Sequence, residues 1–180
     1  DRVAKAMASE SDVVIFDLED SVPPDEKPSA RSMVRGELQR CPTERVFVRV
    51  NSFGSGFLEA DLSEVVVPGL SCIVVPKVDD PGQIREIDAL LTDLEHKIGI
   101  PRSSVMVIPF VESARAVENA YLIAAERSNS PRLYTLAFGA ADYTLDMGIE
   151  MTPGAEELSY GRSRIAIACR AAGLARPLDT

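Results

Sequence analysis

Charged residues follow a series of short apolar runs in this sequence, and the first run is followed by several carboxylates. The run VVIF, residues 13–16, ends on Asp17, and Glu19 and Asp20 come directly after it. Such a cluster suits either a solvated turn or a cation site at the edge of a sheet. Polar or glycine residues follow the later apolar runs as well: Arg49 and Asn51, then Lys77 with Asp79 and Asp80, then Glu112, then Gly139 and Asp142.

Glu112 and Asp142 form the most informative pair, since each follows its apolar run closely in neighbouring units of the chain. Carboxylate oxygens without histidine or clustered cysteine suit a hard cation such as Mg²⁺, which takes one or two carboxylates and completes its shell with water and substrate. The alternative is that Glu112 caps the following helix, where a carboxylate favours the helix dipole. Spacing alone leaves both interpretations open.

Arg49 lies inside the apolar run VFVRV, where an uncompensated charge is costly. It therefore needs either a carboxylate partner, with Glu19 and Asp20 as candidates, or an anionic ligand whose carboxylate the guanidinium can bind in bidentate fashion. Lys77 follows Pro76 at the end of another run. Binding of a substrate anion and simple exposure to solvent are both open for its side chain.

The only histidine, His96, falls late in a polar-faced helical segment and is expected at the surface. Its position argues against a Ser–His–Asp nucleophile and against a histidine-based zinc site. The segment SFGSGF, residues 52–57, is expected to be a loop after Asn51. It could approach a phosphate, but a glycine pair is a weak signal for that.

The elements that must position these residues alternate along the chain. Runs rich in β-branched and aromatic residues predict strands at 13–18, 45–50, 72–77, 105–110 and 133–138, with a sixth starting in ARPLDT. Helical patterns predict helices at 28–39, 81–98, 113–128 and 154–173, with Ser113 as an N-cap and Gly173 as a C-cap glycine, and the opening segment DRVAKAMASE is also helix-like. The alternation predicts the α/β class with a parallel sheet.

Two architectures fit this alternation, an open doubly wound sheet and a barrel of eight βα units. A barrel typically needs ~250 residues, and this chain of 180 supplies about six units. The turn after the first strand, LEDSVPPDEK, contains no glycine, which argues against a dinucleotide-binding sheet. In both architectures ligands bind at the carboxyl ends of the strands, where the polar residues named above are expected.

Composition narrows the function classes. The chain is 46% hydrophobic with a net charge of −9, which suits a globular domain and argues against a nucleic-acid partner. Cys41, Cys72 and Cys169 lie far apart without a CxxC pattern, so we expect reduced thiols in a cytoplasmic protein. No apolar run approaches the ~20 residues of a membrane span. The chain opens on Asp1 rather than Met, so we expect further residues before it in the gene product.

Six stretches of the chain resemble, in order, the citrate lyase beta-subunit family, which also includes malyl-CoA and citramalyl-CoA lyases. They are DLEDSVPPDEKPSAR, VRVN, VVPKV, PFVESARAVENA, FGAADYTLDMG and ELSYGRSRIAIACRAAG followed by LDT. One such piece would be a weak signal, but six in sequence across nearly the whole chain are specific. Two positions depart from the family: VES replaces its usual IET-like tripeptide, and Ala141 stands where an acidic or amide residue is frequent.

The resemblance implies a (β/α)₈ TIM barrel of the phosphoenolpyruvate/pyruvate-binding type, Mg²⁺ dependence and a carbon–carbon lyase. It implies that Glu112 and Asp142 bind the metal, that Arg49 contacts an oxo-acid, and that Glu19 and Asp20 lie beside the metal. The implied catalytic residues are Arg49, Glu112, Glu19 and Asp20. Arg49 and Glu112 are also the implied substrate contacts, and we expect Lys77 and the backbone N–H groups of Gly139, Ala140 and Ala141 to contact the substrate as well.

The family's first strand and its last strand and helices have no counterpart in this chain. Residues 1–180 are therefore expected to form one barrel domain that lacks the first strand and the last one or two βα units, with LDT beginning strand seven. Family members commonly assemble as trimers or hexamers, so a homo-oligomer is expected, with a CoA thioester and an oxo-acid as the small-molecule partners.

The expected reaction is a retro-Claisen cleavage of a 3-hydroxy-3-carboxyacyl thioester into an oxo-acid and an acyl thioester, with Mg²⁺ as Lewis acid. Glu19, Asp20 and a metal-bound water are the candidates for the base. One alternative is a divalent-metal aldolase acting on free hydroxy-oxo acids, although such enzymes typically use a histidine near the first strands. The other alternative is a non-catalytic barrel subunit, against which Arg49, Glu112 and Asp142 argue.

Overall fold

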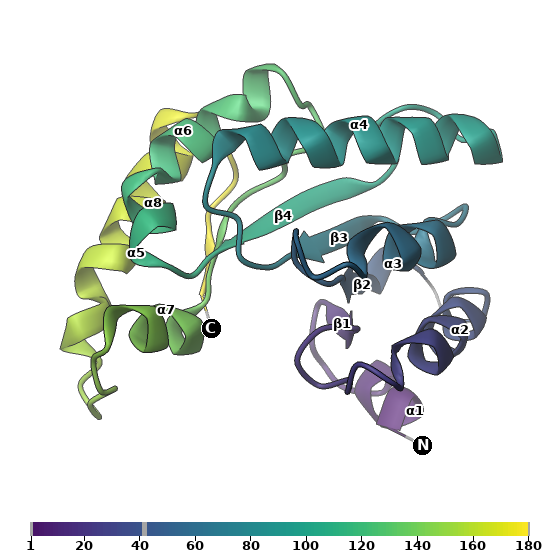
Figure 1. The fold of residues 1–180 in the computed structure, drawn as a ribbon, viewed down its shortest axis with the longest axis horizontal. Helices are drawn as coiled ribbons and strands as arrows, with labels where there is room; N and C mark the ends of the chain where they lie inside the picture. Colours follow the sequence, from purple (N-terminus) through teal and green to yellow (C-terminus); the bar gives the residue numbers. More distant parts are fainter. Residues whose placement is uncertain (1, 41–42, 180) are drawn as a thin grey trace.

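A single curled parallel sheet carries the fold. The computed structural model describes residues 2–40 and 43–179, and six strands within these ranges pair in the order β1-β2-β3-β4-β5-β6. The sheet is open, half of a barrel, with helices along its outer side (Figure 1). The strands are β1 (Val14–Asp17), β2 (Val46–Arg49), β3 (Cys72–Val75), β4 (Met106–Val111), β5 (Ala137–Phe138) and β6 (Leu178–Asp179). The α/β class and the parallel sheet are therefore confirmed.

Helices connect each strand to the next. They are α1 (Arg2–Met7), α2 (Lys27–Leu38), α3 (Leu58–Val65), α4 (Pro81–Ile98), α5 (Ala114–Glu118), α6 (Ala120–Ala125), α7 (Ala140–Met147) and α8 (Ser159–Ala171), with 3₁₀ turns at Thr43–Arg45, Glu126–Ser128 and Glu156–Leu158. Helix α4 has the predicted bounds because both ends are capped. Asp80 accepts from the Gly82 N–H, and Gly99 closes the helix in the left-handed conformation at φ 74°.

The two faces of the sheet bury different residues because the strands are in parallel register. On the outer face Phe16, Val48, Ile73 and Val107 lie in one row and pack against the helices in the main hydrophobic core. The inner face holds a smaller cluster: Cys72, Val74, Ile108, Phe110 and Ala137, with Phe47 and Met106 beside it. Side chains on the inner face thus surround the interior of the half-barrel, and the last residues of β1 and β2 lie on it.

The fifth strand is much shorter than predicted. Only Ala137–Phe138 is a strand, although Leu133 still makes an isolated bridge to Val107. Between these two points the Thr135 hydroxyl donates to the carbonyls of Ala175 and Arg176, on the segment leading to β6. The chain therefore leaves the β4 ladder at this point, and the prediction of one continuous strand over 133–138 was wrong.

Two predicted helices are interrupted, and two further helices went unpredicted. Residues 113–128 divide at Asn119, whose side-chain amide donates to the Asp79 carbonyl (2.8 Å), although Ser113 does cap α5 as predicted. The helix expected from residue 154 begins later, because Ala155 is left-handed (φ 50°) and a 3₁₀ turn follows. Helices α3 and α7 are only eight residues each, too short for a clear apolar stripe.

Ionic groups are also buried within the outer layer. Arg132 is fully buried, and its guanidinium donates hydrogen bonds to the carboxylates of Asp88 (2.7 Å) and Glu95 (2.8 and 2.9 Å) on α4 and to the Val105 carbonyl before β4.

Cys72 and Cys169 are buried free thiols, as expected, while Cys41 lies outside the described residues. In the described part of the chain, no helix is both long and apolar enough to cross a membrane.

Candidate active site

The carboxyl ends of β1 and β2 place an arginine between two carboxylates. Asp17 and Arg49 are the last residues of their strands and are partners in register, so their side chains lie on the same inner face. The Arg49 Nε and Nη2 donate to the two carboxylate oxygens of Asp17, each at 2.6 Å. The third nitrogen, Nη1, lies 3.0 Å from Glu19 Oε2. The guanidinium is thus held from two sides.

Asp17 is the partner that the sequence interpretation missed. It had considered Glu19 or Asp20 for Arg49; Glu19 does pair with it, whereas Asp20 Oδ1 lies 3.8 Å from Lys77 Nζ instead. Burial raises the pKa of Asp17, but hydrogen bonds from Arg49, Ser21 and the Glu19 N–H outweigh burial and lower that pKa to about 2. The Asp17 hydrogen bonds raise the pKa of Arg49 above its ordinary value. Both groups therefore stay charged.

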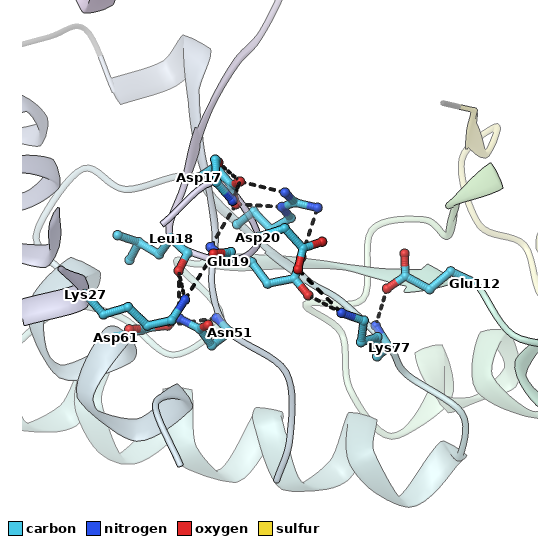
Figure 2. A network of polar contacts seen from close by, with 11 residues as sticks. Asp17, Leu18, Glu19, Asp20, Lys27, Asn51, Asp61, Lys77 and Glu112 are labelled. Carbon is cyan, nitrogen blue, oxygen red and sulfur yellow. Dashed lines mark hydrogen bonds and ion pairs between the residues drawn. The ribbon is translucent and has the colours of Figure 1, made fainter. Parts of the chain in front are cut away.

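Glu19 lies between two cations. Its Oε1 accepts from Lys77 Nζ at 2.7 Å (Figure 2). Its buried Oε2 lies 3.0 Å from Arg49 Nη1. Its side chain is 6% exposed, against 58% for Asp20, so the two neighbouring carboxylates have different environments. Burial raises the pKa of Glu19, and the hydrogen bond from Lys77 and the charge of Arg49 oppose that shift.

Glu112 follows β4 directly and points into the same region (Figure 2). It is buried, and its Oε1 accepts from the backbone N–H of Lys77 at 2.6 Å. Burial raises the pKa of Glu112 to about 7; the Lys77 N–H opposes this shift, and the negative charges of Asp142 and Glu19 add to it. Glu112 is therefore a buried carboxylate that accepts the Lys77 N–H and lies near other carboxylates.

Gly139 brings the start of α7 against Glu112. A Cβ at position 139 would lie 2.8 Å from the Cβ of Glu112, closer than real Cβ contacts, so only glycine fits without a shift. Asp142 lies in the first turn of α7 and is half-buried. Ala140 is buried and Ala141 is exposed at the same helix start. The predicted group Gly139–Asp142 is thus beside Glu112.

A buried polar network holds the backbone of the loop that follows β1. The ammonium of Lys27 donates to the carbonyls of Leu18 (2.9 Å) and Glu19 (3.0 Å), and the Asn51 amide also donates to Leu18 O (2.9 Å; Figure 2). Asp61 on α3 accepts from the Asn51 backbone and side chain and pairs with Arg31. Because these groups are buried, the network fixes the backbone that carries Glu19.

The donor set fits a hard cation held by few protein ligands. Within residues 2–40 and 43–179 no group of three or more His, Cys, Asp or Glu side chains could hold a metal ion. Burial is the main cause of the raised pKa of Glu112, and the charge of Asp142 adds to it, so a cation beside Glu112 would favour its ionised form. One or two carboxylates completed by water and substrate oxygens are the ligation that Mg²⁺ accepts. A cage built of protein ligands alone is not available here.

Some polar residues at the strand ends have other functions. Asp80 caps α4, and Asp79 accepts from the Ser113 hydroxyl (2.5 Å). His96 is exposed on α4, as expected. Residues 52–57 form a loop that, together with residues 19–24 and Lys77, lines a cavity of about 450 Å³ beside Glu19. The structure thus brings together Arg49, Glu19, Asp20, Lys77, Glu112 and the start of α7, and leaves Asp79 and Asp80 to structural contacts.

Sequence reasoning missed Asp17 as a partner, and it missed Lys27 and Asp61 altogether. The sequence did contain a signal for Asp17. The apolar strands VIFD and VFVR each end on one charged residue, Asp17 and Arg49, and the two charges are opposite. Lys27 and Asp61 left no such signal, since each is one of several polar residues in a helix of mixed composition.

The chain is similar to proteins of one known family. The family model "HpcH/HpaI aldolase/citrate lyase" matches residues 1–180. The chain is 37% identical over 167 residues to the citrate lyase subunit beta of Leuconostoc mesenteroides subsp. cremoris, covering 92% of this chain and 54% of the relative. It is 33% identical over 153 residues to the L-malyl-CoA/beta-methylmalyl-CoA lyase of Cereibacter sphaeroides, covering 82% and 47%.

A solved structure is similar over almost the whole chain. The citrate lyase beta subunit of M. tuberculosis, complexed with oxaloacetate and magnesium, superposes with a TM-score of 0.78 at 30% identity, covering 99% of this chain and 72% of that one. The chain spans about half the length of the two curated relatives described above.

Proposed function

Because the chain belongs to the HpcH/HpaI aldolase/citrate lyase family, we propose that it is a Mg²⁺-dependent carbon–carbon lyase. The proposed substrate is a 3-hydroxy-3-carboxyacyl thioester of the citryl-, citramalyl- or malyl-CoA type, and the products are an oxo-acid and an acyl thioester. The observation that carries the proposal is geometric: the start of α7, which bears Asp142, packs against the buried Glu112, near the strand ends where Asp17 and Glu19 hold Arg49.

Each residue has a proposed role that follows from its environment. Glu112 and Asp142 hold the metal, which supplies Lewis-acid polarisation of a substrate oxygen when bound. Arg49 binds the carboxylate of the oxo-acid, and its orientation is set by Asp17 and Glu19 before substrate arrives. The Gly139 N–H donates to the Val111 carbonyl (3.2 Å), which fixes the start of α7 beside Glu112, and the backbone N–H of Ala141 in the first turn of α7 binds a remaining carboxylate oxygen.

Glu19 and Asp20, in the loop after β1, have different proposed roles. Glu19 is buried with its oxygens turned to Lys77 and Arg49, so it orients these cations. Asp20 is mostly exposed and lies 3.8 Å from Lys77 Nζ, so its oxygens are accessible to the proton of the substrate hydroxyl. As this proton leaves, the carbon–carbon bond cleaves and its electrons pass to the acyl thioester as an enolate, which is then protonated.

Binding and turnover measurements test this proposal. Calorimetry should detect Mg²⁺ binding and Mg²⁺-dependent oxaloacetate binding to the wild-type protein; Glu112→Gln and Asp142→Asn should abolish both, and the exposed-surface control Glu86→Gln should retain both. Malyl-CoA or citramalyl-CoA should be cleaved, and EDTA should stop the reaction. Turnover of the free acid alone would favour the aldolase alternative, and absence of any metal-dependent binding would favour the non-catalytic subunit.

Two proposals extend to the whole assembly. We propose that the curled sheet belongs to a (β/α)₈ barrel formed as a single domain, which is supported by the one-sided pairing of β1 and β6 in the described residues and by the exposed inner-face residues Ile15 and Leu178 on these edges. We also propose a homo-oligomer of three or six subunits, which family resemblance supports. Light scattering measures the latter, and a monomeric protein would contradict it.

A further inference from the structure

Lys77 has an unusual backbone conformation for a residue with a side chain. It follows β3, and its φ of 55° lies in the left-handed region, where an L side chain crowds its own backbone. Positions of this kind persist where the surrounding contacts hold them, and they concentrate at functional sites. The contacts of Lys77 therefore indicate what the strained conformation achieves.

The conformation directs both ends of Lys77 toward carboxylates of the candidate site. Its backbone N–H donates to Glu112 Oε1 at 2.6 Å, while its ammonium donates to Glu19 Oε1 at 2.7 Å and lies 3.8 Å from Asp20 Oδ1 (Figure 2). Glu112 follows β4, which neighbours β3, whereas Glu19 follows β1, two strands away. One residue thus links the two sides of the site.

A purely structural turn would not explain the side chain. Glycine adopts this conformation without strain and would offer the same N–H to Glu112. Ser103 is also left-handed, and its N–H donates to Glu95 Oε2, but that contact lies in the network around Arg132 away from the site. What distinguishes Lys77 is its ammonium, on a side chain that is 42% exposed and therefore accessible from solvent.

We propose that Lys77 is a positioning residue that fixes Glu19 relative to Glu112, and that its role is not primarily direct binding of the substrate. This inference rests on the proposed lyase function. Its ammonium draws Glu19 Oε1 toward β3, which leaves Oε2 at 3.0 Å from Arg49 Nη1. Without the ammonium, the buried Glu19 has Arg49 as its remaining cationic partner and turns toward it. The guanidinium would then lose the orientation in which it meets the oxo-acid carboxylate.

Three substitutions of Lys77 distinguish the contribution of its ammonium from that of its backbone N–H. Lys77→Gly and Lys77→Met both remove the ammonium and keep the backbone N–H, and Lys77→Gly also removes the strain. Lys77→Arg keeps a cation at this position. Lys97→Met is the matched control, because Lys97 is an exposed lysine on α4 that pairs with Asp93. All are compared with the wild-type protein in its full length.

The measurements are calorimetric titration with Mg²⁺ alone, titration with oxaloacetate in the presence of Mg²⁺, thermal melting and turnover of the thioester. Since the N–H on Glu112 remains, Mg²⁺ affinity should not weaken in any variant. Lys77→Gly and Lys77→Met should lose about 10–100-fold in turnover and in oxaloacetate affinity, the range found when an outer-shell partner is removed. Lys77→Arg should recover most of that loss, and Lys97→Met should match the wild type.

Chemical rescue adds a result that a structural role cannot produce. Propylammonium should restore part of the turnover of Lys77→Gly, since the vacated space is open to solvent, and should leave Lys97→Met unchanged. Unaltered turnover and oxaloacetate binding in Lys77→Met would overturn the positioning role while leaving the lyase function intact. A lowered melting temperature with equal losses in all Lys77 variants, Lys77→Arg included, would also overturn it. A wild-type protein that binds neither Mg²⁺ nor oxaloacetate would overturn the lyase function and this role together.

Discussion

At the scale of single residues, the candidate site depends on opposite charges that hold one another in fixed orientations. Arg49 is fixed by the fork of Asp17 and by Glu19, so an incoming carboxylate meets a guanidinium that has little conformational freedom left to lose. Glu112 differs, because its neighbours Asp142 and Glu19 carry the same charge. The candidate site therefore combines an arginine held by two carboxylates with a neighbouring group of like-charged carboxylates, the combination that a cation and an anionic substrate would complete together.

The close approach of Gly139 to Glu112 gives a first prediction. In Gly139→Ala the new methyl group meets the Cβ of Glu112 at 2.8 Å, so either Glu112 or the start of α7 must move. We expect Mg²⁺ affinity, measured by calorimetry, to fall by about 10-fold or more. Gly36→Ala is the control, because nothing lies within 4 Å of its added Cβ in the middle of α2. Equal Mg²⁺ binding by both variants would contradict the packing described here.

The low pKa of Asp17 predicts how stability depends on pH. This pKa falls from an ordinary value of 3.8 to about 2 in the folded protein, so ionised Asp17 stabilises the fold above the unfolded pKa. The contribution, on the order of 2 kcal/mol, is lost as pH falls from about 4 to about 2. In urea denaturation the stability difference between wild type and Asp17→Asn should therefore stay constant from about pH 7 to about pH 5 and narrow as pH falls from about 4 to about 2. A difference independent of pH would contradict this.

At the scale of elements, interactions away from the site hold the helices against the sheet. Arg132 links α4 to the segment before β4, and Glu95 also accepts the N–H groups of Ser103 and Val105. Burial raises the pKa values of Asp88 and Glu95. Hydrogen bonds, chiefly from Arg132, outweigh burial, so both pKa values lie below their ordinary values. Both carboxylates are therefore ionised and matched to one buried guanidinium.

Removing this guanidinium should be among the most damaging single changes in the helical layer. Arg132→Met leaves the buried carboxylates of Asp88 and Glu95 without their main partner, which should cost about 3–5 kcal/mol in the free energy of unfolding. Arg35→Met removes an arginine that is 44% exposed and should change that free energy by about 0–1 kcal/mol. Urea denaturation followed by circular dichroism compares them, and similar losses in both variants would contradict the central role of Arg132.

At the scale of the whole molecule, the open sheet has an inside and two edges. Strand β3 pairs with β2 and β4, whereas β1 and β6 each pair with one strand in the described residues. The site occupies the carboxyl ends of these strands, as in parallel α/β folds generally. The arrangement therefore depends on the curvature that turns the ends of β1 and β4 toward each other.

Hydrogen exchange should report this architecture directly. Amides of β3 and β4, with partners on both sides, should exchange most slowly in the 180-residue chain, and those of β1 and β6 should exchange fastest among the strands. Mass spectrometry of exchanged peptides measures the order. Equal protection of β1, β3 and β6 would contradict an open sheet in this chain and would indicate that the edges are covered.

Much of the fold could be predicted because it depends on local patterns. Apolar runs of the right length predicted β1 to β4 nearly in place, and the capping residues Asp80 and Gly99 lie at the ends of the helix predicted at 81–98. The errors lie where a distant contact decides the local structure. Thr135 leaves its strand to reach residues 175–176, and Asn119 breaks its helix to reach Asp79.

The sequence by itself determined the class of fold, the family and the residues that end the strands, because parallel strands and their connecting helices leave periodic signals and strand ends collect ligand-binding groups. Only the tertiary structure decided which of these residues meet. Asp17 pairs with Arg49, Lys77 joins Glu19 to Glu112, and Gly139 touches Glu112. These pairings depend on register, on one left-handed residue and on the curl of the sheet, which are properties of the packed chain and leave no periodic trace in its sequence.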